Sequence, residues 1–261
     1  GDHETAVAAC RRAIAIRNNE PGVYVTLGSA LLGLGKVDEA ASAYRRSLRI
    51  LPGYPDAAFH LAMVNLMRGR FRDGWAGFDY RFKGPRATKR TCEPRWNGTS
   101  LKGRTLHVMR EQGLGDDIMY ASCYPQLIAD ASRCVIECEP RLEKLFQRSF
   151  PEATFFPIVD NASKTEVLDI DGIDVRIFSA SVPAYLRNSL RDFPEHQGYL
   201  KVDPVRSEYW RSRLACLGSG LKIGLSWRGG TVWTHSRRRT LDLKMLLPLL
   251  KLRNVQWVNL Q

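Results

Sequence analysis

The sequence predicts an α + α/β protein, in which an array of helical hairpins precedes a parallel α/β region. Two observations carry this prediction. Residues 1–82 repeat with a period of 34 residues, and residues 104–120 read as a buried strand, a glycine turn and the start of a helix. Beyond that point strands and helices alternate, which is the order from which parallel sheets are built.

Small and aromatic side chains recur at the 34-residue period in the first segment. The matching pairs are Leu27 and Leu61, Gly28 and Ala62, Gly35 and Gly69, Val37 and Phe71, Ala40 and Gly74, and Tyr44 and Phe78. This period is that of the tetratricopeptide repeat, an antiparallel helix pair in which small residues allow close packing. Residues 1–82 resemble such repeats over their whole length, and residues 1–18 fit the second helix of a preceding unit. Arrays of this kind present a surface to a peptide or protein, so we expect a protein partner.

The last helix predicted in the repeats is unusually aromatic. Trp75, Phe78, Tyr80 and Phe82 are expected to join the repeats to the next domain rather than to bind a ligand. Residues 83–103 then combine glycine, proline and basic residues without a sustained period, which predicts a solvated linker.

Residues 104–202 predict one α/β domain. Its expected strands span 105–110, 134–139, 153–159 and 174–179, and its expected helices span 116–132, 140–149 and 182–190. The alternation predicts a parallel sheet with the first strand at its centre and helices on both faces. Residues 203–220 predict a connecting helix. Residues 221–261 predict the incomplete start of a second such domain, with strands at 221–227 and 255–260 around a helix at 241–252.

Composition limits the classes of partner. The formal net charge of +12 favours an anionic partner, which charge alone does not identify further. No apolar run has the length of a membrane span, and no known nucleic-acid module is present, so we expect neither a span nor a nucleic-acid partner. The six cysteines lack zinc-like spacing, so we expect no metal site. We expect reduced, buried thiols in a cytoplasmic protein, with Cys134 and Cys138 on one face of a strand.

The loop at residues 111–117, EQGLGDD, follows the first predicted strand, where open α/β folds bind ligands. Its two glycines indicate backbone angles or close approaches that a side chain would prevent. It is an incomplete dinucleotide fingerprint, even though Glu139 stands where a ribose-binding acid would be. The third glycine is absent, and Asp116 and Asp117 at the helix start would repel a pyrophosphate. Asp116 is therefore either the helix N-cap or a general base that faces a hydroxyl-bearing substrate.

A second cluster of chemistry-bearing residues follows the strand predicted at 221–227. Arg228 and three consecutive arginines at 237–239 lie in a loop with no acid before Asp242. Arginine forks suit a diphosphate, although such a run is also typical of a solvated surface or a nucleic-acid contact. Asp169 and Asp171 match a pattern that holds metal-bound sugar diphosphates. They precede a strand, where a turn favours aspartate, and we interpret them as structural.

Several of these motifs together carry a second resemblance. Trp96-Asn97-Gly98, the EQGLGDD loop and the GLSWRGG motif at 224–230 resemble bacterial tetratricopeptide-repeat proteins with a GT-B glycosyltransferase-like region. That region is similar to the ADP-heptose heptosyltransferases and, more distantly, to O-linked N-acetylglucosamine transferases. The resemblance implies a Rossmann-like fold for residues 104–202. It also implies inverting, metal-independent transfer of a sugar from a nucleotide-sugar to an acceptor hydroxyl, with no cofactor besides the donor.

The resemblance also implies roles for individual residues. Asp116 matches the proposed catalytic base. We predict that the rest of its loop binds the acceptor, through Glu111, Gln112, Gly113 and Gly115. Arg228 and Arg239 are predicted to bind the donor phosphates. The nucleotide-binding stretch of the family would lie beyond Gln261, so we expect this chain to be inactive by itself. The alternative is a non-enzymatic scaffold whose repeats bind a partner protein.

Overall fold

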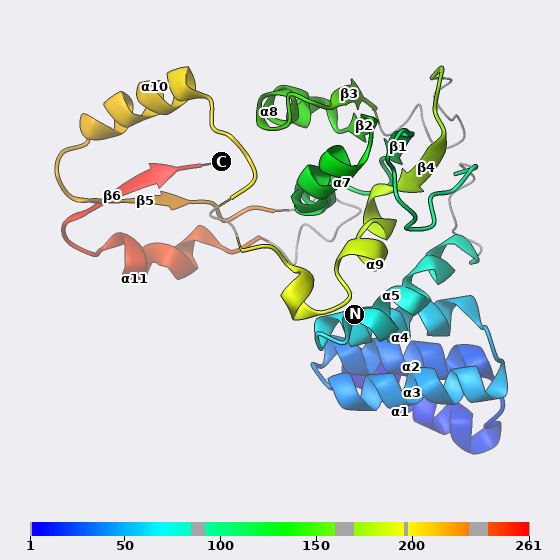
Figure 1. Ribbon diagram of the computed structural model, residues 1–261. Coiled ribbons are helices and arrows are strands. Elements are labelled where there is room, and N and C mark those ends of the chain that lie inside the picture. The colour runs from blue at the N-terminus through cyan, green and yellow to red at the C-terminus, as the bar shows by residue number, and fades with distance from the viewer. Residues whose placement is uncertain (1, 85–91, 160–169, 196–197, 230–239, 261) are drawn as a thin grey trace. The chain divides into compact units, whose positions relative to one another are not determined.

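The computed structural model describes residues 2–84, 92–159, 170–195, 198–229 and 240–260 (Figure 1). The chain forms two compact units, Gly1–Lys201 and Val202–Gln261. The first unit contains both the helical repeats and a parallel sheet. The second contains a small sheet of its own.

The first unit begins with five helices, which stack on one another (Figure 1). They are α1 (His3–Ile16), α2 (Pro21–Gly33), α3 (Val37–Ile50), α4 (Pro55–Met67) and α5 (Phe71–Phe78). Short turns make neighbouring helices antiparallel. Gly35 and Gly69, which are 34 residues apart, adopt φ of +75° and +70° just after α2 and α4, in the left-handed region that glycine favours. The predicted helical repeat of tetratricopeptide type is confirmed by this geometry.

The recurring small residues allow the helices to approach closely. A Cβ atom on Gly28 would lie 2.5 Å from Cε1 of Tyr44, whose side chain is fully buried. In the next unit, a Cβ atom on Gly77 would lie 3.0 Å from Cβ of Ala62. The period seen in the sequence is therefore a packing requirement.

We expect Gly28→Ala to lower the free energy of unfolding by about 1–3 kcal/mol, because the new methyl group overpacks the buried Tyr44 ring. Gly22→Ala is the matched control on the same helix, where the nearest atom to an added Cβ is the Tyr54 hydroxyl at 3.6 Å. That control should be neutral or slightly stabilising. Chemical denaturation measures both variants, and equal stabilities would contradict the packing argument.

A four-stranded parallel sheet follows the repeats. It consists of β1 (Thr105–Met109), β2 (Arg133–Cys138), β3 (Thr154–Pro157) and β4 (Val175–Phe178). The strand order is β3-β2-β1-β4, with every neighbouring pair parallel. The prediction that the first strand lies inside a parallel sheet is confirmed.

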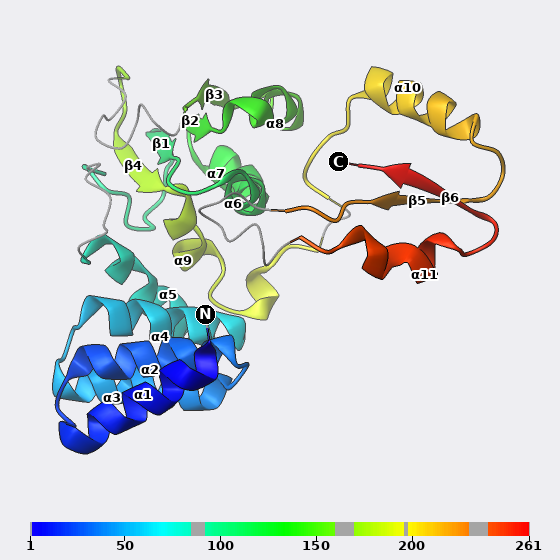
Figure 2. The same cartoon turned by 180° about the vertical axis from the view of Figure 1, so that it is seen from behind.

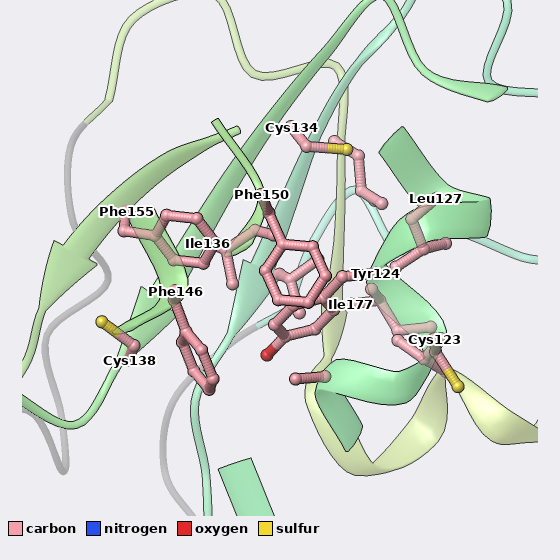
Figure 3. Packing of buried hydrophobic residues seen from close by; sticks show 14 of the residues in the cluster. Cys123, Tyr124, Leu127, Cys134, Ile136, Cys138, Phe146, Phe150, Phe155 and Ile177 are labelled. Atoms are coloured by element: carbon pink, nitrogen blue, oxygen red, sulfur yellow. The ribbon is translucent and has the colours of Figure 1, made fainter. Parts of the chain in front are cut away.

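One face of this sheet is covered by helices and carries the main core. The helices are α6 (Leu114–Tyr120), α7 (Tyr124–Asp130) and α8 (Glu143–Ser149). Figure 3 shows the rings of Tyr124, Phe146, Phe150 and Phe155 gathered beside Ile136 and Ile177. The single helix predicted at 116–132 is interrupted by a 3-10 turn at Ala121–Cys123. Pro125, in the first turn of α7, lacks the N–H that a continuous helix would need there.

The sequence predicts helices on both faces of the sheet, but the opposite face is covered in another way. Met109 and Phe178 on this face pack with Cys92 and with Phe82, which ends the 3-10 helix η1 (Asp79–Phe82) after α5. The ring centroids of Phe82 and Phe178 are 4.9 Å apart. Among the described residues, the end of the helical repeats therefore covers part of the sheet face that a helix was expected to cover.

The second half of the predicted linker belongs to the α/β core. Trp96 and Leu101 are buried in the main cluster. The Trp96 N–H donates to the Arg176 carbonyl at 2.8 Å, and the Arg176 N–H donates to the Pro94 carbonyl at 2.8 Å, so this segment extends the sheet beside β4. Two large apolar side chains gain more by joining the core than by staying in water, which explains why this half is not a solvated linker.

The cysteines follow the predicted pattern with one exception. Cys134 and Cys138 lie in the core on the same face as Ile136, and Cys10, Cys92 and Cys123 are also buried thiols. Cys216 is exposed, which corrects the expectation that all six would be buried.

The second unit consists of α10 (Pro204–Ala215), β5 (Leu221–Leu225), the 3-10 helix η7 (Leu243–Leu246), α11 (Leu247–Leu250) and β6 (Val255–Asn259) (Figure 2). β5 and β6 are parallel. None of its described residues is buried, and large apolar side chains such as Trp210, Met245 and Leu260 are exposed. Two strands bury too little apolar surface to form a core of their own.

Candidate functional site

The loop after β1 enters α6 with a glycine as its cap. Gly113 is the N-cap, with extended backbone angles of φ −84° and ψ 176°. Asp116 is the third residue of the helix, and its Oδ2 accepts a hydrogen bond of 3.0 Å from the Gly113 N–H. The prediction that Asp116 is the N-cap is therefore wrong by three positions, because its carboxylate reaches back to the cap from inside the first turn.

The two glycines of this loop are not required by the fold of the described residues. Neither has positive φ. A Cβ atom on Gly113 would come no closer than 3.5 Å to its neighbours, at Asp116 Oδ2, and a Cβ atom on Gly115 would meet nothing within 4 Å. The expectation of a strained angle or a close internal contact is not met. Both glycines are exposed and leave bare backbone at the carboxyl edge of the sheet.

Glu111 in the same loop binds an arginine at the end of the helical repeats. Its carboxylate accepts from Arg81 Nη2 at 2.7 Å and from Arg81 Nε at 3.1 Å, and its Oε1 also accepts from the Ala180 N–H at 3.2 Å. Ala180 lies in the 3-10 helix η4 (Ser179–Ser181), directly after β4. Glu111 thus binds other residues of this chain where the sequence predicted contact with an acceptor. Gln112 beside it is half-buried.

Arg81 is the centre of a buried polar junction. Its side chain, 10% exposed, also donates to Asp79 Oδ1 at 2.6 Å and to Ser181 Oγ at 2.7 Å. The guanidinium carbon lies 4.3 Å from the Phe78 ring centroid and 4.0 Å from that of Phe82. Burial acts to raise the pKa of Asp79, but Arg81 and Arg95 outweigh it and hold that pKa below its usual value.

The junction lies where the sheet reverses its strand order. Arg81 contacts Glu111, which follows β1, and Ser181, which follows β4. The gap between two such strand ends is the usual ligand site of an open α/β sheet. In this chain an arginine from the repeats already bridges them.

A second buried pair lies on the other side of the β1 end. Arg110 Nε donates to Asp117 Oδ2 at 2.6 Å, and the same oxygen accepts from the Glu139 N–H at 3.0 Å. Burial raises the pKa of Asp117 to about 6, although the bond from Arg110 opposes the shift. From the sequence alone, Asp117 is only a charge at a helix start. The signal in the sequence for its partner is Arg110 at the strand end, six residues before the first of two aspartates.

The neighbouring strand adds two further acids. Glu137 Oε2 accepts from the Arg110 N–H at 2.8 Å, and its Oε1 lies 3.2 Å from Nε2 of the fully buried His107. Glu139 accepts two hydrogen bonds of 2.7 Å from Arg141, and these bonds lower the pKa of Glu139 to about 2. If Glu139 were the ribose-binding acid, its carboxylate would first have to release Arg141.

The predicted phosphate-binding residues belong to a later part of the chain than this loop. Arg228 is exposed and follows β5 in the second unit. Arg239 and Asp169 lie outside the described residues. The structure therefore brings together Glu111, Gln112, Gly113, Gly115 and Asp116.

The fold and this site define a class of protein: helical repeats of tetratricopeptide type, joined through a buried polar junction to a parallel four-stranded α/β domain. The chain is similar to protein FlbA of Caulobacter vibrioides (strain ATCC 19089 / CIP 103742 / CB 15), with 28% identity over 249 residues, which cover 89% of this chain and 42% of that protein. The chain thus spans less than half the length of this curated relative. No family model matches the chain.

Two solved structures are similar to part of the chain. One is MamA, with 25% identity and a TM-score of 0.29, covering 31% of this chain and 47% of that one. The other is the Yersinia enterocolitica type III secretion translocator chaperone SycD, with 18% identity and a TM-score of 0.29, covering 31% of this chain and 56% of that one. Throughout the described ranges, no helix is both long and apolar enough to cross a membrane.

Proposed function

We propose that this chain is a protein-interaction scaffold whose helical repeats bind an acidic segment of a partner protein. The observation that carries the proposal is a surface hollow of about 520 Å³ on α3, lined by Ser42, Arg45, Leu48 and Arg49. Helical repeat arrays are suited to this role because stacked helices give a broad, preformed surface. Leu48 offers an apolar contact between the two arginines.

The charges on the repeats support an acidic partner. Arg11 and Lys36 lie within 3.5 and 3.6 Å of Glu39, and Arg68 pairs with Asp38. In contrast, Arg45 and Arg49 are exposed and pair with no acid in the part of the chain that the structure describes. Two unpaired arginines one helical turn apart repel each other, and an incoming carboxylate relieves that repulsion.

A peptide-display selection on the 261-residue chain tests this function. We expect enrichment of peptides with clustered Asp or Glu, and affinity about tenfold lower in Arg45→Glu/Arg49→Glu, with stronger binding at low salt. Arg191→Glu/Arg206→Glu, which changes the charge equally at two other exposed arginines, is the control and should bind as the wild type does. Selection of neutral or basic peptides, or equal losses in both double variants, would overturn the proposal.

A second candidate function is sugar transfer by a GT-B-type domain, with a nucleotide-sugar as donor and no metal or further cofactor. The observation that favours it is the bare backbone of Gly113 and Gly115 at the carboxyl end of the central strand, where open α/β sheets bind ligands. Asp116 is half-buried there, and its Oδ2 is used by the Gly113 N–H. In this proposal Asp116 is the general base, and Arg228 and Arg239 hold the donor diphosphate.

This second candidate is tested on a whole protein that contains the chain, with UDP- and ADP-sugars as donors. Asp116→Asn should abolish transfer and leave the melting temperature unchanged, because an amide oxygen can still accept from the Gly113 N–H. Absence of donor binding by the whole protein would reject sugar transfer and leave the scaffold as the function of this region.

A further inference from the structure

An apolar cavity of about 280 Å³ lies between the helical repeats and the α/β domain, within the first unit. Leu66 and Trp75 line it from α4 and α5, and Met119 lines it from α6. On the remaining side, Pro183 of α9 (Pro183–Leu186) lines the cavity, and so does Arg187, which directly follows this helix. Helix α9 packs on α5 (Figure 1). Met119 is 53% exposed, so the cavity reaches the surface.

Arg187 is a buried cation without an acidic partner in the described residues. Its side chain is 2% exposed. Its guanidinium donates only to neutral oxygens: the Gln126 side-chain oxygen, the Leu186 carbonyl at 2.8 Å and the Ser122 carbonyl at 3.3 Å. A buried charge is expensive unless an opposite charge accompanies it, so this site favours an anion.

The arginine also has uncommitted donors for that anion. The three bonds use both N–H groups of Nη1 and one of Nη2. The remaining pair of donors, on Nε and Nη2, meets no acceptor among the residues that the structure describes. An arginine uses such a neighbouring pair to make two parallel bonds to one carboxylate.

We propose that this cavity binds a medium-chain fatty acid, with its alkyl chain among the apolar side chains and its carboxylate on Arg187. A peptide fits the cavity less well, because its backbone would bring amide groups for which the walls offer few partners. The Ser122 hydroxyl, for example, uses its one donor on the Met119 carbonyl at 2.7 Å, so it has none for a peptide carbonyl. The volume is at the lower limit of small-molecule sites, roughly 300 Å³, which suits a chain on the order of eight carbons.

Calorimetric titration of the 261-residue chain with octanoate tests the proposal. We expect octanoate to bind at one site. Hexanoate should bind about fifteenfold more weakly, because it lacks two methylene groups and each contributes about fourfold to the affinity. Octan-1-ol should also bind more weakly than octanoate, because it lacks the charge. Equal binding of octanoate and octan-1-ol would overturn the role of Arg187. Tighter binding of N-acetyl-leucine, which mimics a protein C-terminus, would overturn the choice of a fatty acid.

Two variants locate the site. Met119→Glu places a negative charge at the exposed mouth of the cavity and should reduce octanoate binding at least tenfold. The matched control is Met67→Glu, at a methionine that is 62% exposed on α4 and does not line the cavity. Arg187→Gln should abolish octanoate binding and retain octan-1-ol binding. If Arg187→Gln does not fold, the methionine pair still decides, and equal octanoate binding in both methionine variants would overturn the proposal.

Discussion

Replacing Arg81 with leucine will lower the free energy of unfolding of the first unit by about 3–5 kcal/mol. The change removes both guanidinium bonds to Glu111, whose carboxylate stays buried at 8% exposure with only the Ala180 N–H as a described donor. It also removes the bond to Ser181 and one of the two arginines that hold the pKa of Asp79 down. Chemical denaturation of wild type and variant measures the loss.

Two comparisons make this expectation specific. Arg11→Leu removes an ion pair of 3.5 Å with Glu39 whose side chains are both at least half exposed, and it should change stability by less than about 1 kcal/mol. Arg81→Leu/Glu111→Leu removes the stranded carboxylate and should recover most of the loss. A double variant as unstable as Arg81→Leu alone would show that packing against the rings, rather than the buried charge, accounts for the effect.

As pH falls from 7 to 4, the wild type will gain about 2.4 kcal/mol of stability relative to Asp117→Asn. Burial raises the pKa of Asp117 to about 6 in the folded chain, against 3.8 for the free residue. The folded state therefore holds this proton more tightly than the unfolded state does. The resulting stabilisation is complete below pH 3.8 and is lost as pH rises through 6. Asparagine does not titrate, so the difference between the two proteins isolates this carboxyl group.

Denaturation at several pH values measures that difference. Burial lowers the pKa of His60, which opposes the trend below its usual pKa, but His60 is present in both proteins and cancels. Parallel stability curves for wild type and Asp117→Asn would show that the carboxyl group titrates normally.

The repeats and the central strand could be predicted from the sequence because their signals are local. Gly28 and Tyr44 recur one unit later as Ala62 and Phe78. In each unit, the small residue and the aromatic residue lie on two successive helices of the array. The alternation of strands and helices likewise places β1 inside a parallel sheet without knowledge of distant contacts.

The partners of the loop residues could not be predicted, because they come from elsewhere in the chain. Glu111 pairs with Arg81, 30 residues earlier and in a different architecture, and no pattern in the sequence links the two. Asp117 titrates abnormally only because the surrounding fold buries it. The helix boundary differs from the sequence prediction for another reason: Gly113 caps the helix without a side chain, so the sequence pattern points to Asp116, the first aspartate, instead.

The junction at Arg81 also affects how this protein can evolve. Repeat arrays are often exchanged between proteins as independent modules, but here the last helical segment supplies the counterion of an acid in the neighbouring domain. A recombination that joined a different array to this sheet would remove Arg81 and leave Glu111 with a buried charge. We therefore expect the two architectures to be retained together, and a change at either residue to be tolerated best when the other changes with it.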